Sequence, residues 1–149
     1  MIQRIQSLWF LLASLASVLI FFYPVIEIST ENKLFIWQFE SISIAGIDKL
    51  IQSGFIVAGL TIIIAFLSFV SIFLFKNRIL QIRISTVISL LVIFTAALIG
   101  IFTLSLKENG ILSLGLSSIL PLIVFILIMM ARRAVKKDEK LVKSVDRIR

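Results

Sequence analysis

Residues Ile84 to Leu106 read ISTVISLLVIFTAALIGIFTLSL, and this stretch decides the fold of the 149-residue chain. It contains no Asp, Glu, Lys, Arg or His. At a rise of 1.5 Å per residue, a helix of this length measures about 34 Å. The hydrocarbon core of a bilayer is about 30 Å thick. The stretch therefore predicts a helix that crosses a membrane.

Three further uncharged stretches repeat this pattern on either side. The chain is 60% apolar with a mean hydropathy of +1.14, whereas soluble domains are about 45–50% apolar. We therefore predict an all-α integral membrane protein whose four transmembrane helices cover 7–26, 53–75, 84–106 and 111–131. Because the connections between the last three are short, sequence neighbours should pack side by side in an antiparallel four-helix bundle.

The first span is expected to remain in the mature protein. A weak small-residue cleavage site lies at Ser14 to Ala16, but the apolar run continues beyond it, which is unlike a signal peptide. Ala13 and Ser17 in this span are a small pair at i and i+4, which lets helices approach closely. We expect the pair to pack inside the bundle, the alternative being a contact with another protein.

Basic residues are unevenly distributed among the connections. Segments 1–6, 76–83 and 132–149 carry twelve Lys or Arg, whereas 27–52 and 107–110 carry three. Since positive charge is retained on the cytoplasmic side, both termini are predicted to be cytoplasmic.

The larger outer loop, 27–52, has the alternating pattern of β-strands. Aromatic residues occupy every second position from Phe35 to Phe39, Ile42 and Ile44 alternate with serines, and Val25 to Ser29 is a candidate first strand of a hairpin. Phe35, Trp37 and Phe39 are candidate contacts of this loop. They either form an exposed edge that recruits a partner or, as we prefer, lie over the helix ends at headgroup level.

The residue types that are missing exclude several kinds of chemistry. The sequence has no Cys and no His, so disulfides, thiol nucleophiles and the commonest metal ligand and general base are absent. No acid or base lies within a predicted span, as ion-coupled carriers usually require. We expect no catalytic activity, cofactor, metal or nucleic-acid partner.

Pro121 lies inside the fourth predicted span, after Ser117 and Ser118. Because proline removes a helical hydrogen bond, we expect a kink there. The kink either opens a binding notch or, as we prefer, only shapes the packing of the bundle.

The last segment, 132–149, is predicted to be a cytoplasmic basic amphipathic helix. It reads RRAVKKDEKLVKSVDRIR and carries eight basic residues. Arg132, Arg133, Lys136 and Lys137 should hold the end inside and contact anionic lipid. If the fourth helix continues, an apolar stripe forms from Ala134, Leu141, Val145 and Ile148. The membrane interface, a second copy or a cytoplasmic partner are the candidate contacts of this stripe.

The start MIQRIQSLWFLLA, the inner loop FKNRILQIR and the tail RRAVKKDEKLVKSVDRIR resemble a family of small four-span bacterial inner-membrane proteins. That family is classed as a domain of unknown function. The resemblance covers the whole chain and implies an intact first span and a location in the bacterial inner membrane. It brings no activity, substrate or catalytic residue.

We therefore expect a non-catalytic accessory or scaffold subunit of a larger inner-membrane assembly, such as one for protein export or insertion, that docks through its cytoplasmic face. The alternative is an oligomeric membrane protein that handles small solutes or lipids along a path lined by Ser and Thr.

Overall fold

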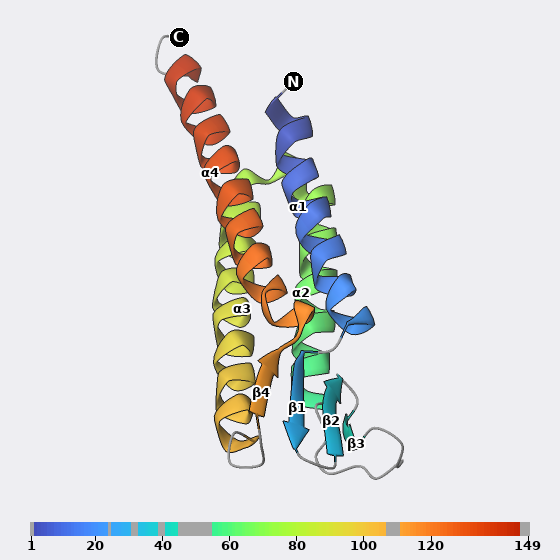
Figure 1. Cartoon of the computed structure of the whole chain (residues 1–149). Helices are drawn as coiled ribbons and strands as arrows, with labels where there is room; N and C mark the ends of the chain where they lie inside the picture. The colour runs from blue at the N-terminus through green and yellow to red at the C-terminus, as the bar shows by residue number, and fades with distance from the viewer. Residues whose placement is uncertain are drawn as a thin grey trace.

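The structure is a computed structural model that describes residues 2–23, 25–30, 33–38, 41–44, 55–106 and 111–146. Four long helices form a bundle, and a small sheet lies at one end of it (Figure 1). The helices are α1 (Ile2–Leu19), α2 (Phe55–Phe73), α3 (Arg78–Leu106) and α4 (Leu120–Asp146). Helices that are neighbours in the sequence contact each other, and α1 also contacts α4, which closes the ring. The expected helical bundle is therefore present.

Three helices in the described part of the chain are long and apolar enough to cross a membrane. The spans are Ile5–Phe22, Phe55–Phe73 and Arg78–Leu104. By length and composition the chain is a membrane protein. Many apolar side chains on the outside of the bundle are exposed, for example Phe66 and Leu90, as expected where lipid replaces water.

The bundle interior is apolar with hydroxyl groups between the helices. Phe10, Ala13, Ile88 and Ile128 are fully buried in its larger core cluster. Ser17 is also fully buried, and its hydroxyl donates to the Ala13 carbonyl at 2.8 Å. The small pair in the first span therefore packs inside the bundle, as predicted.

The predicted inner loop, 76–83, is mostly helical. A short 3-10 helix, η2 (Leu74–Lys76), follows α2, and α3 begins at Arg78. The Asn77 side chain accepts a hydrogen bond from the Leu80 backbone N–H at 3.3 Å. Asparagine is a favoured residue immediately before a helix for this reason, so α3 begins there rather than at Ile84.

The other end of the bundle carries a four-stranded antiparallel sheet, in the order β3-β2-β1-β4. Its strands are β1 (Ile26–Thr30), β2 (Lys33–Gln38), β3 (Ser41–Ile44) and β4 (Ile111–Leu114). Ile28 of β1 pairs with Phe35 of β2 on one side and with Leu112 of β4 on the other. Three of these strands lie in the predicted outer loop, but β4 comes from the predicted fourth span.

The prediction of one helix over 111–131 is wrong. Residues 111–114 form β4, a 3-10 helix η4 follows at Leu116–Ser118, and α4 begins only at Leu120. β4 is held by its pairing with β1, and the Gly115 backbone N–H donates to the Val25 carbonyl at 3.1 Å. The connection between the third and fourth helices, predicted to be short, therefore also includes a strand and a short 3-10 helix.

The predicted kink at Pro121 is not present, because Pro121 lies at the start of α4. Pro121 is the second residue of α4, where a backbone N–H would have no partner in the helix and its loss costs little. The Ser117 hydroxyl donates to the Tyr23 carbonyl at 2.8 Å. This bond fixes the beginning of α4 against η1 (Ile20–Phe22), the 3-10 helix that ends α1.

Candidate functional site

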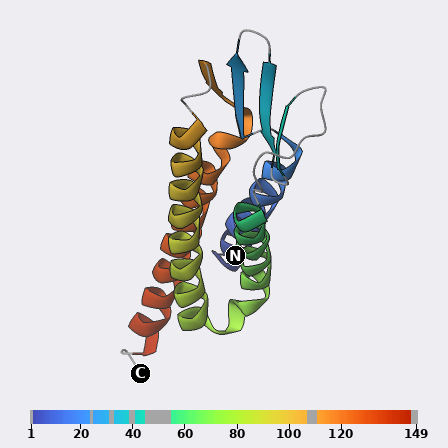
Figure 2. The same cartoon turned by 90° about the horizontal axis from the view of Figure 1, so that it is seen from below.

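Both termini lie at the end of the bundle away from the sheet, which we call the terminal end (Figures 1 and 2). There α4 continues without a break from its apolar part into the basic tail, as far as Asp146. The prediction that the tail extends the fourth helix is therefore confirmed for residues 132–146.

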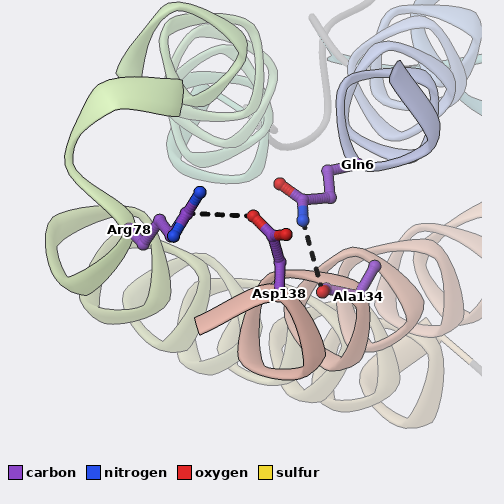
Figure 3. Close-up of polar contacts among 4 residues, drawn as sticks. All are labelled: Gln6, Arg78, Ala134 and Asp138. Carbon is purple, nitrogen blue, oxygen red and sulfur yellow. Dashed lines mark hydrogen bonds and ion pairs between the residues drawn. The ribbon is translucent and has the colours of Figure 1, made fainter. Parts of the chain in front are cut away.

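A polar cluster of Gln6, Arg78 and Asp138 lies at the terminal end (Figure 3), and Gln81 follows Arg78 by one turn in α3. Arg78 Nε of α3 lies 2.9 Å from Asp138 Oδ2 of α4. This oxygen makes no hydrogen bond of acceptable geometry, so the contact is an ion pair. The Arg78 side chain is 24% exposed and the Asp138 side chain 11%, so the pair is largely shielded from solvent.

Gln6 joins the first helix to the same place. Its Nε2 donates to the Ala134 carbonyl of α4 at 3.3 Å, and its side chain lies close to Asp138 in Figure 3. Gln6 is 3% exposed. Contacts from α1 and α3 therefore fix the position of α4 within one turn, between Ala134 and Asp138.

Gln81 extends the cluster toward α2. Its Nε2 donates to the Ser71 carbonyl at 2.9 Å, and the residue is 1% exposed. Its Oε1 is buried and has no hydrogen-bond partner in the described part of the structure. Because an unmet buried acceptor costs free energy, Gln81 ties α2 to α3 at some cost to stability.

Sequence reasoning did not identify this cluster. Asp138 was not among the predicted site residues, yet it follows Ile128, Ala131 and Val135 on the stripe that α4 turns toward the bundle. The spacing of i, i+3, i+7 and i+10 places all four on one helix face. The acidic residue on this apolar stripe is therefore the sequence feature that could have identified the cluster.

The predicted basic residues have different environments. Arg133, Lys136 and Lys137 are exposed. Arg132 is half-buried, and its Nε has no hydrogen-bond partner in the described part of the chain. These residues therefore form a cationic surface around α4 where it leaves the apolar part of the bundle.

The predicted apolar stripe of the tail is only partly seen. Ala134 is half-buried, and Leu141 is 46% exposed. Val145 belongs to α4 but its side chain is not described, and Ile148 lies outside the described residues. The stripe that the bundle buries is Val124, Ile128, Ala131 and Val135, which the prediction did not select.

The predicted outer-loop contacts lie far from the terminal end. The backbones of Phe35 and Trp37 lie in β2, at the opposite end of the molecule, and Phe39 lies outside the described residues.

A small cavity lies between the four helices, in the half of the bundle nearer the sheet. Residues from all four helices line it, including Ser17, Thr61, Thr95 and Pro121. About 10 Å³ is accessible to the centre of a water-sized sphere, enough for one water molecule. The hydroxyls of Ser17, Thr61 and Thr95 each donate to a carbonyl four residues earlier in their own helix. The cavity is thus too small for a solute larger than water.

Residues 2–148 match the family model described as "Domain of unknown function (DUF4293)". The chain belongs to this family. The DUF4293 match covers every described element, from α1 through the sheet to the end of α4. The predicted membership of a family of unknown function is confirmed. Neither the comparison with curated proteins nor the comparison with solved structures gave a match.

Proposed function

We propose that this chain is a non-catalytic accessory or scaffold subunit of a larger assembly in a bacterial inner membrane, such as one for protein export or insertion. The observation that carries the proposal is the continuity of α4. One helix runs from the core of the bundle, at Val124, to Asp146 beyond it. A continuous helix holds its far end at a fixed position relative to the membrane domain, where a partner can bind it. A loosely tethered tail has no such fixed position.

The fixed base of the projecting helix supports this role. Asp138 is paired with Arg78, and Ala134 accepts a hydrogen bond from Gln6. A tail that only retains the chain on one side of a membrane needs charge but no fixed direction. Holding α4 by two other helices is the expected design for a docking element, because preorganisation lowers the entropic cost of binding.

The proposed topology has four crossings with both termini in the cytoplasm. The fourth crossing combines η4 with the twelve residues from Leu120 to Ala131. Twelve α-helical residues rise about 18 Å, and η4 with Ile119 adds roughly 6–8 Å. The sum of about 25 Å approaches the hydrocarbon thickness. Arg132, Arg133, Lys136 and Lys137 then contact anionic headgroups at the inner surface.

The test is co-purification in mild detergent through a tag in the outer loop. A stoichiometric partner that binds the full chain and is lost on truncation after Lys140 supports the proposal. This truncation retains Asp138 and hence the ion pair with Arg78, so the bundle keeps its fixed α4. Recovery of the chain alone would contradict the proposal.

A second candidate is an oligomer that handles a small solute or a lipid. Its path has to lie between copies, because the cavity of one chain holds only one water, and the partly exposed hydroxyls of the helices, such as that of Thr103, are the groups that favour it. Solute flux in proteoliposomes tests this candidate. Flux that is reproducible and changes with Thr103→Val, a partly exposed residue of α3, would support it over the accessory role.

A further inference from the structure

Two arginines lie at the ends of the uncharged parts of α3 and α4. Arg83 is followed by residues 84–106, which contain no charged side chain. Arg132 is preceded by residues 111–131, which contain none either. Because apolar helix lies in the hydrocarbon and charged side chains lie at its edge, both guanidinium groups are at the boundary with the headgroup layer. This is the depth of the phosphate groups of phospholipids.

The two arginines are also at nearly the same height on neighbouring helices. Arg78 of α3 is paired with Asp138 of α4, which aligns these antiparallel helices at that point. Arg83 lies five residues beyond Arg78, and Arg132 lies six residues before Asp138. These steps correspond to about 7.5 Å and 9 Å, both toward the sheet.

Arg132 and Lys136 lie on the side of α4 that is next to α3. Ala134 contacts Gln6 of α1. Arg132 and Lys136 are each two residues from Ala134, and so about 160° around the helix from it. The buried Val135 separates the two sides. Since α4 is in contact with α1 and α3, the side away from α1 is the one beside α3.

Arg83 borders the same place on α3. Arg78, Ile82 and Thr86 follow one another at intervals of four residues, so the stripe that starts at the contact with α4 turns gradually outward. Thr86 is partly buried, and its hydroxyl donates to the Ile82 carbonyl at 2.9 Å. Arg83 is exposed and precedes Thr86 by three residues, so it lies on the outer edge of this stripe.

Neither arginine has a carboxylate partner within the described ranges. The ion pair found there joins Arg78 to Asp138. Arg132 Nε is shielded from solvent and has no hydrogen-bond partner among the described residues. On the same side of α4, Glu139 lies seven residues further along, or about 10 Å from Arg132. A shielded guanidinium N–H without an acceptor costs free energy, which an external anion would recover.

We infer that Arg83 and Arg132 together bind the phosphate of one anionic phospholipid, in the leaflet at the terminal end. Guanidinium groups bind phosphate through pairs of hydrogen bonds, and basic sites between transmembrane helices bind anionic headgroups. Lys136 lies one turn nearer the helix end, where its charge disfavours the ammonium group of a zwitterionic lipid. Leu90, seven residues beyond Arg83 on the same face, is 63% exposed and contacts the acyl chains. The inference requires no protein partner and is therefore separate from the proposed function.

The experiment measures lipid binding by the full-length protein, purified in mild detergent and freed of bound lipid. Phosphatidylglycerol is added, and native mass spectrometry counts the lipid molecules on each chain. We expect one tightly bound phosphatidylglycerol, whose binding weakens about tenfold in Arg83→Gln with Arg132→Gln. Arg83→Gln alone changes an exposed residue and leaves the half-buried Arg132 in place. It should weaken the same binding severalfold.

The matched control is Arg133→Gln with Lys137→Gln, which removes the same charge from α4. Both residues are exposed, and each is two residues from the buried Val135, so both lie on the outer face. This control should bind phosphatidylglycerol as the parent does. An equal loss in the two double variants would overturn the inference, because it would show a general attraction of the charged tail. Equally tight binding of phosphatidylethanolamine, or displacement of the lipid by an equal concentration of inorganic phosphate, would also overturn it.

Discussion

Asp138 and Arg78 form an ion pair between helices at the terminal end, with Gln6 close by. The pair is largely shielded from water, so each charge depends on the other for its solvation. The Coulomb attraction also fixes which turn of α4 faces the start of α3. One acidic residue thus contributes both to stability and to the direction of the projecting helix.

We expect Asp138→Asn to destabilise the bundle by about 1–3 kcal/mol, because it leaves the Arg78 guanidinium without its counter-charge. This range is lower than that for a fully buried pair since Arg78 is 24% exposed. Thermal unfolding in detergent measures the change. The control is Lys137→Gln, an exposed neighbour that should have little effect.

A double-mutant cycle shows whether the effect belongs to the pair. With Arg78→Gln in the background, Asp138→Asn should cost clearly less than it does alone, since its partner is already gone. Additive losses would mean that the two residues act independently.

Ser117→Ala should destabilise the bundle by roughly 0.5–1.5 kcal/mol. The Ser117 hydroxyl joins the beginning of α4 to the Tyr23 carbonyl, 94 positions away in sequence. Ser118→Ala is the matched control, because among the described residues the Ser118 hydroxyl donates to the Gly115 carbonyl in the same turn. Equal losses in thermal stability for the two variants would show that the long-range hydrogen bond contributes no more to stability than the local one.

At the scale of elements, α4 has three parts. The first is buried in the bundle, the second is held by α1 and α3 between Ala134 and Asp138, and the third, residues 139–146, extends beyond these contacts. Truncation after Lys140 should leave the melting temperature of the bundle unchanged, because the removed residues lie beyond the contacts with α1 and α3. Truncation after Lys137 should lower it, because Asp138 is lost. The comparison separates loss of docking from loss of stability, and equal melting temperatures would contradict the clamping role of Asp138.

The helices of the fold could be predicted from the sequence, but β4 could not. A helix such as α2 is marked by a continuous apolar run long enough to span a bilayer. The four residues ILSL at 111–114 are equally compatible with a strand or a helix. Their state is decided by pairing with β1, a contact that no local pattern encodes.

Only part of the candidate site could be predicted from the sequence, because the rest depends on contacts with other helices. The tail was recognised as a basic helix from its composition, and α4 bears this out as far as Asp146. The apolar stripe predicted for the tail was Ala134, Leu141, Val145 and Ile148, and the face that the bundle buries, at Ala131 and Val135, was not predicted. The phase of a tail helix is set by the helices beside it, which a reading of the tail alone does not include.

At the scale of the whole molecule, the sheet and the termini occupy opposite ends of the bundle. If both termini are cytoplasmic, Ser43→Cys in β3 should react with a membrane-impermeant maleimide in right-side-out vesicles. Lys140→Cys should react only after permeabilisation. The parent chain has no cysteine and is the unlabelled control. Labelling in the opposite order would reverse the proposed orientation.

The position of β4 in the sheet has a consequence for how the protein is made. Ser29 of β1 pairs with Ile111 of β4, 82 positions later in the chain, so this edge of the sheet closes only after α3 has been synthesised and inserted. Until then, β1 offers an open edge to other chains, a known route to aggregation. Pairing of β4 therefore completes the sheet late in synthesis. In the proposed orientation, a chain in which β4 is delayed is open to misassembly and proteolysis outside the cytoplasm.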